Sequence, residues 1–112
     1  MNGAKILILG VAYKQDIDDY RESPALKVIS NFEKEGATIS FNDIYIKHFE
    51  NDRKVYESVE LTAENVSNAD LVVITTCHTN YDYDFIQKHA KFIFDTKNAM
   101  KNIKSRYNIE TL

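Results

Sequence analysis

Near the start of the chain, an apolar run, a long charged stretch and the start of a helix follow one another, and this order limits the folds that the chain can adopt. Lys5–Leu9 is a short apolar run that ends at Gly10, a pattern typical of a parallel strand buried on both faces. Residues 11–22 then carry several charges, and loops of that length are usually functional. Ser23-Pro24 predicts a helix start, because serine caps free N–H groups and proline suits the first turn. In open α/β sheets, ligands bind beyond the carboxyl ends of strands, where this loop would lie.

The rest of the chain alternates between predicted strands and helices. Alternation of this kind predicts right-handed crossovers and a parallel sheet. We therefore predict an α/β fold, namely a three-layer α/β/α Rossmann-like domain with a mostly parallel sheet of four to five strands. Helices are predicted at 24–35, 62–68 and 84–90 with a helical turn near 99–103, and strands at 38–42, 71–75, 92–94 and 106–109. Residues 44–60 show no clean period, so we expect turns there and one short strand at 54–56.

Length and composition exclude several classes of protein. The 112 residues, 44% of them hydrophobic, suit one domain over residues 1–112. A net charge of −3 argues against a nucleic-acid binder, which usually carries a basic patch. No run approaches the ~18 apolar residues of a membrane span and no signal peptide is recognisable, so we expect a cytoplasmic protein without a membrane partner. One cysteine allows no internal disulfide, and three histidines without ligand spacing predict no metal site.

The first turn lacks the pattern of a dinucleotide site. Such a site needs G-x-G-x-x-G, so that the backbone can approach a pyrophosphate and the helix can pack closely. Here Gly10 is followed by no glycine until Gly36, so NAD binding in the usual mode is not expected. Asp43, at the end of the second predicted strand, is placed either to bind a ribose or to cap a turn. We favour the turn.

Four spaced motifs resemble one known family. Residues 10–26 (GVAYKQDIDDYRESPAL) resemble the opening of the C-terminal UDP-binding domain of the UDP-glucose/GDP-mannose dehydrogenase family, in which G-x-A-[YF]-K, an acidic spacer and R-E-S-P-A recur. Residues 43–45 (DIY) resemble its D-P-Y, residues 69–78 (ADLVVITTCH) its A-D-x-x-[IV]-[IV]-T-x-[HW], and residues 94–98 (FDTKN) its F-D-x-[RK]-N. The resemblance covers nearly the whole chain.

The resemblance implies which residues would bind ligands. Members oxidise the C6 alcohol of a UDP-sugar to the uronic acid with NAD, in polysaccharide biosynthesis. By position, Tyr13, Lys14 and Lys97 would bind the UDP-sugar, and Arg21 would lie toward the cofactor. The residues alone leave alternatives open, because Lys14 and Arg21 could equally neutralise the acids of their loop, and Lys97 could be a plain surface lysine.

The resemblance also implies that this chain lacks the catalytic groups. In the family the catalytic cysteine, the general base and the glycine-rich NAD site lie upstream of this domain, so we expect no catalytic residue here and no activity from the chain alone. Cys77 and His78 are neighbours in an extended segment, where side chains point to opposite faces, so they are not expected to form a nucleophile pair. We expect His78 to shape the pocket rim or the loop.

Two functions from different classes remain. The first is the UDP-binding domain of an NAD-dependent nucleotide-sugar 6-dehydrogenase, a homo-oligomer when complete, with the T-x-H motif favouring a UDP-N-acetylhexosamine over UDP-glucose or GDP-mannose. The second is a stand-alone nucleotide-binding or regulatory module without catalysis. An upstream reading frame that encodes the NAD domain would favour the first, and a native start at Met1 would favour the second.

Overall fold

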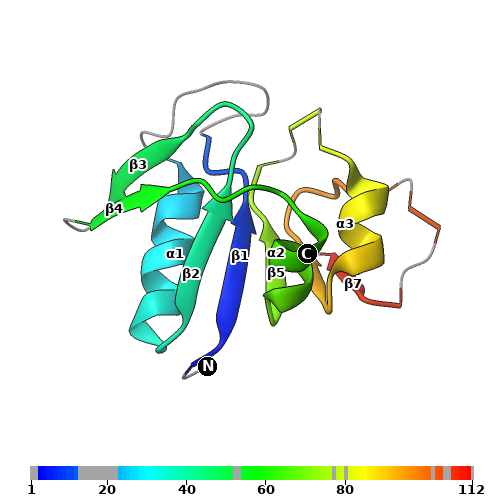
Figure 1. The fold of residues 1–112 in the computed structure, drawn as a ribbon, viewed down its shortest axis with the longest axis horizontal. Helices are drawn as coiled ribbons and strands as arrows, with labels where there is room; N and C mark the ends of the chain where they lie inside the picture. The colour runs from blue at the N-terminus through cyan, green and yellow to red at the C-terminus, as the bar shows by residue number, and fades with distance from the viewer. Residues whose placement is uncertain are drawn as a thin grey trace.

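The computed structural model describes residues 3–12, 23–51, 54–76, 78–79, 81–101, 103–104 and 107–111. Its helices and strands follow the order shown in Figure 1. They are β1 (Lys5–Leu9), α1 (Pro24–Lys34), β2 (Thr38–Asn42), β3 (His48–Asn51), β4 (Lys54–Glu57), α2 (Ala63–Asn68), β5 (Leu71–Ile74), α3 (Tyr83–His89), β6 (Ile93–Asp95) and β7 (Ile109–Thr111). No helix among the described residues is long and apolar enough to cross a membrane.

Five strands form one sheet in the order β2-β1-β5-β6-β7, and every neighbouring pair is parallel. Helix α1 covers one face, while α2 and α3 cover the other (Figure 1). The predicted three-layer α/β/α architecture with a mostly parallel sheet is therefore confirmed. Since β2 and β5 lie on opposite sides of β1, the strand order reverses between β1 and β5.

The central strand β1 is buried on both faces, as its apolar run predicts. Side chains alternate along a strand, so Ile6 and Ile8 pack with Ile29 of α1 in one cluster. Leu7 and Leu9 belong to the opposite cluster, which includes residues of α2 and α3. Apolar packing on both faces therefore fixes the position of β1 in the sheet.

The helix starts follow the capping residues read from the sequence. The Ser23 hydroxyl accepts the Ala25 N–H at 3.2 Å, with proline at the first helical position of α1. The Thr62 hydroxyl accepts the Asn65 N–H at 3.1 Å and so begins α2, as predicted. Helix α3 begins one residue earlier than predicted, because the Asp82 carboxylate caps it.

The least regular region of the sequence holds a hairpin of β3 and β4, of which only β4 was predicted. The missed strand β3 buries a single side chain, Phe49, so it has no readable period. Phe49 stacks on Tyr56 with ring centroids 4.7 Å apart, and the Tyr56 hydroxyl donates to a carboxylate oxygen of Glu33 on α1. The hairpin therefore packs beside α1, beyond the edge strand β2 (Figure 1).

The end of the chain is less regular than predicted. Residues 99–101 form turns, and the Ile103 N–H donates to the Met100 carbonyl at 3.0 Å, which closes one turn where a single helical turn was predicted near 99–103. The edge strand β7 begins at Ile109, where the prediction ended it, although the Asn108 carbonyl already accepts the N–H of Ile93 in β6 at 2.7 Å. The Asn108 side-chain amide donates to the carbonyls of Gln87 and Ala90, and so joins the start of β7 to the end of α3.

Candidate functional site

The candidate site is the carboxyl edge of the sheet at the reversal of strand order between β1 and β5. In open α/β sheets this is where ligands bind. The residues that follow β1, β2, β5 and β6 meet at this edge, since the carboxyl ends of parallel strands all lie on the same side. The polar groups there come from segments far apart in the sequence.

Asp43, which follows β2, is the polar centre of this edge. Its side chain is fully buried, and its Oδ2 atom accepts the N–H of Val11 at 2.8 Å and that of Ala12 at 3.2 Å. Its Oδ1 atom accepts the N–H of Tyr45 at 2.8 Å and of Ile46 at 3.0 Å. The carboxylate thus holds its own turn and the start of the loop after β1, in keeping with the turn role favoured from the sequence.

His78, which follows β5, pairs with this carboxylate. Its Nε2 atom lies 2.9 Å from Oδ2 of Asp43, and the histidine side chain is fully buried. The Tyr45 ring contacts the imidazole edge-to-face, with centroids 4.9 Å apart. The sequence predicted that His78 shapes the pocket rim or the loop. The structure buries the side chain, and its ring nitrogen pairs with a carboxylate 35 residues away that holds the start of the loop after β1.

The surroundings shift two acid–base equilibria. Burial alone would raise the pKa of Asp43, but hydrogen bonds from His78 and from the N–H groups of Tyr45 and Val11 outweigh it and lower the pKa below its ordinary value. Burial and the nearby Asp43 charge raise the pKa of Tyr81 far above its ordinary value. The Tyr81 hydroxyl stays protonated and donates to the Asn42 carbonyl at 2.7 Å. The edge therefore holds an ionised carboxylate beside a neutral phenol.

The crevice between β1 and β5 is filled by the protein itself. Gly10 has φ of +85°, and a Cβ atom there would lie 2.5 Å from both Cβ and the carbonyl oxygen of Thr76. The Thr75 hydroxyl donates to the Gly10 carbonyl, and the Thr76 hydroxyl donates to the Ala12 carbonyl at 2.8 Å. A dinucleotide needs open space and free N–H groups at this turn, so these residues do not fit one.

Three of the four predicted binding residues, Tyr13, Lys14 and Arg21, lie outside the described residues, as does Cys77. The residues that flank segment 13–22 are described, and they touch. The Ser23 hydroxyl donates to the Ala12 carbonyl at 3.3 Å. The segment therefore leaves and rejoins the described structure at one place on the carboxyl edge.

Lys97 is exposed in a turn that follows β6. The turn is built on the fully buried Asp95, whose carboxylate accepts the N–H groups of Lys97 at 3.0 Å, Ala99 at 3.0 Å and Met100 at 2.7 Å. Asn98 adopts φ of +55°. Sequence reasoning missed the role of Asp95, although an aspartate directly after an apolar strand is itself a signal for such a turn.

A cavity of about 470 Å³ opens beside Asp43 at this edge, between the loop after β2 and the start of α3. Asn42, Lys47, Tyr81 and Phe85 are among the residues that line it. It offers a cation and an apolar wall next to the buried carboxylate.

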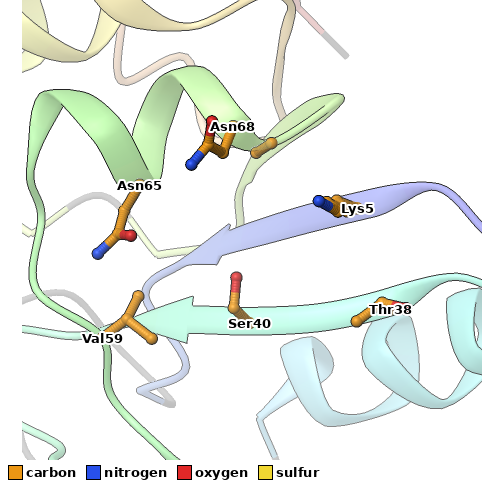
Figure 2. A pocket seen from close by; sticks show the side chains of 7 residues that line it. Lys5, Thr38, Ser40, Val59, Asn65 and Asn68 are labelled. Atoms are coloured by element: carbon orange, nitrogen blue, oxygen red, sulfur yellow. The ribbon is translucent and has the colours of Figure 1, made fainter.

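A second cavity, of about 200 Å³, lies elsewhere and is shown in Figure 2. Lys5 and Thr38, the first residues of β1 and β2, line it together with Asn65 and Asn68 of α2. It lies toward the amino ends of the strands, so we place the candidate site at the carboxyl edge. Within the described part of the chain, no group of three or more His, Cys, Asp or Glu residues could hold a metal ion.

Comparison with known proteins identifies relatives over almost the whole chain. Residues 7–102 match the family described as "UDP-glucose/GDP-mannose dehydrogenase family, UDP binding domain". The chain is 38% identical over 104 residues to the UDP-N-acetyl-D-mannosamine dehydrogenase of Methanocaldococcus jannaschii, covering 86% of this chain and 23% of that protein. It is 30% identical over 109 residues to the UDP-glucose 6-dehydrogenase of Rhizobium meliloti, covering 90% of this chain and 24% of that protein.

A solved structure agrees with the sequence matches. The UDP-D-ManNAc dehydrogenase of Pyrococcus horikoshii superposes with a TM-score of 0.74 at 27% identity, covering 98% of this chain and 25% of the other. The chain therefore spans about a quarter of the length of these relatives.

Proposed function

Because this chain belongs to the UDP-glucose/GDP-mannose dehydrogenase family and matches its UDP-binding domain, we propose that it is the part of an NAD-dependent UDP-sugar 6-dehydrogenase that binds the nucleotide. The match over residues 7–102 carries this proposal. The substrate is UDP-glucose or a UDP-N-acetylhexosamine, which the complete enzyme oxidises to the uronic acid for polysaccharide biosynthesis. Residues 1–112 form a single domain in this proposal.

The carboxyl edge supports the assignment of binding residues. Segment 13–22, which carries Tyr13, Lys14 and Arg21, joins the described structure there, and exposed Lys97 follows β6 on the same edge. An ammonium group acts as a point charge for phosphate, whereas a guanidinium can bind it in a bidentate way. We assign Tyr13, Lys14 and Lys97 to the UDP-sugar and Arg21 to the cofactor side. Binding of the remote UDP group would orient the sugar carbon that reacts.

The cofactor and the remaining machinery belong elsewhere in this proposal. The turn after β1 does not fit a dinucleotide, since a Gly10 Cβ would collide with Thr76 and Asp43 already binds the Val11 and Ala12 N–H groups. NAD is therefore bound mainly by other domains of a cytoplasmic homo-oligomer. The 112-residue chain alone is expected to form no NADH with any UDP-sugar, and its Cys77→Ala variant should behave identically.

Titration of the purified chain with UDP and with NAD tests the proposal. We expect saturable UDP binding with Kd in roughly the millimolar range, equivalent to ~4 kcal/mol, because other domains would complete the pocket. NMR amide shifts or calorimetry would measure it, with NAD as the comparison ligand. Tight NAD binding without any response to UDP would reject the assignment.

A further inference from the structure

Two successive backbone N–H groups after β1 converge on one anion, and that anion belongs to the protein. The N–H groups of Val11 and Ala12 both donate to Oδ2 of Asp43, at 2.8 and 3.2 Å. In doubly wound α/β proteins that bind nucleotides, the N–H groups of this first turn meet a ligand phosphate at the reversal of strand order. The same donors are already engaged here.

We propose that Asp43 is a built-in anion that occupies the phosphate position of this fold and so excludes nucleotide phosphate from the β1–β5 crevice. It acts as a positioning and specificity residue, because it determines where on the carboxyl edge a phosphate can bind. In dinucleotide-binding folds the acidic residue at the end of the second strand is usually free to bind a ribose. Here Asp43 instead accepts the N–H groups of Val11 and Ala12 after β1.

The hydrogen bonds to the Asp43 carboxylate oppose its displacement by a ligand. Five groups donate to or pair with it, the N–H groups of Val11, Ala12, Tyr45 and Ile46 and the ring nitrogen of His78. Its side chain has no exposed surface. A phosphate that entered would be repelled by the buried negative charge of Asp43. It would also have to compete with this carboxylate for the same hydrogen-bond donors.

The neighbouring backbone closes the remaining space. Thr76 lies against Gly10 so closely that even one added carbon atom would overlap it. No buried side-chain nitrogen or oxygen in the described part of the chain lacks a partner, so no buried side-chain donor there is free to bind a ligand. If the proposed function holds, the substrate diphosphate must therefore bind farther out along the edge, where Lys97 is exposed.

Chemical rescue of the 112-residue chain tests the inference. Asp43→Ala removes the carboxylate and should lower Tm by about 5 to 15 °C, because charge-assisted hydrogen bonds are lost. Sodium formate, compared with sodium chloride at equal ionic strength, should recover about half of this loss. It should also shift the Val11 and Ala12 amide resonances of the variant in a saturable way. Neither formate nor inorganic phosphate should shift them in the unmodified chain.

Two further variants complete the test. Asp82→Ala is the matched control, since Asp82 lines the same cavity and caps α3 from an exposed position, so formate should not rescue it. Asp43→Asn keeps the size of the side chain, so it replaces Asp43→Ala in the test if that variant does not fold. Its Val11 and Ala12 amide protons should move upfield as the charge-assisted bonds weaken.

Two outcomes overturn the inference. The first is a response of Val11 and Ala12 to phosphate or formate that is as strong in the unmodified chain as in the variant, because the position would then be open. The second is an Asp43→Asn spectrum in which both amides keep their resonances. A chain that fails to bind UDP would reject the proposed function alone, since the formate experiment does not use UDP.

Discussion

The Nε2 atom of His78 lies 2.9 Å from the Oδ2 atom of Asp43, and both side chains are fully buried. The same oxygen accepts the N–H groups of Val11 and Ala12. One atom therefore joins the loops that follow β1, β2 and β5. Any change to this pair should therefore alter the positions of Val11 and Ala12, which lead into segment 13–22.

Replacement of His78 by alanine should lower the free energy of unfolding by about 1.5 to 3 kcal/mol, because a hydrogen bond to a buried charged group is lost. Urea unfolding with an unchanged m-value would measure it. His48→Ala is the control, since His48 is exposed on β3 and should change stability by less than about 0.5 kcal/mol. Equal effects of the two substitutions would show that the pair contributes little.

The pair also predicts how stability depends on pH. Burial raises the pKa of Asp43, but the His78 and backbone hydrogen bonds lower it further than burial raises it, so the folded pKa lies below the ordinary value. A lowered folded pKa contributes stability that is present above the unfolded pKa of about 3.9 and is lost as pH falls through the folded pKa. Among the described residues, His78 pairs with the carboxylate and Tyr81 lies near it, and Tyr81 stays neutral in this range because its pKa is raised.

The measurement compares the unmodified chain with Asp43→Asn by urea unfolding between pH 5 and pH 3. We expect the difference in unfolding free energy to shrink as the pH falls below about pH 4. A difference that stays constant to pH 3 would contradict the lowered pKa.

Gly10→Ala should destabilise the chain by about 2 to 5 kcal/mol, combining the strain of positive φ with overlap against Thr76. Gly3→Ala is a matched control, because Gly3 has φ of +80° but open space around the added carbon. It should cost only the backbone strain, about 1 to 2 kcal/mol. Chemical denaturation of both variants would separate the two contributions, and identical losses would show that Thr76 moves aside freely.

Lys97→Ala should weaken UDP binding by roughly ten- to a hundred-and-fifty-fold, the loss expected for one charged hydrogen bond to phosphate of about 1.5 to 3 kcal/mol. Unfolding free energy should stay within about 0.5 kcal/mol, because the side chain is exposed. Lys101→Ala removes another exposed lysine four positions later and should leave UDP affinity unchanged. Similar affinities for both variants would make Lys97 a plain surface lysine.

In the complete enzyme, Lys14→Ala should raise the KM for the UDP-sugar, whereas Arg21→Ala should act more on NAD or on turnover. The expected loss is again about 1.5 to 3 kcal/mol for each charged contact. If both residues only neutralise the acids of their loop, each pair is worth about 0 to 1 kcal/mol. Steady-state kinetics with both substrates varied would decide, and values within about threefold of the unmodified enzyme would remove these two cations from the site.

Local features explain why most of the fold could be predicted. The continuous apolar runs of β1 and β5 required burial on both faces, and Ser23 and Thr62 marked helix starts through hydrogen bonds within their own turns. Strand β3 was missed because only Phe49 faces the core, so its sequence carries no alternation. Its stability comes from ring contacts with residues of other strands.

The candidate site was harder to predict because its contacts are not local. Asp43 and His78 lie 35 residues apart, and they meet only because β2 and β5 end at the same edge on either side of β1. The sequence indicated a turn for Asp43 but not a buried partner for His78. The close approach of Thr76 to Gly10 likewise depends on sheet order, which single residues do not encode.

The carbonyl of Ala12 accepts the hydroxyl groups of both Ser23 and Thr76, so the two ends of segment 13–22 are joined independently of what lies between them. A loop closed at its base adds little closure entropy when it grows, about 0.6 kcal/mol for each doubling of length. Insertions and deletions within this segment should therefore be tolerated by the fold. Variants that differ in the length of this segment should keep the contacts of Ala12 with Ser23 and Thr76, and with them the sheet beneath.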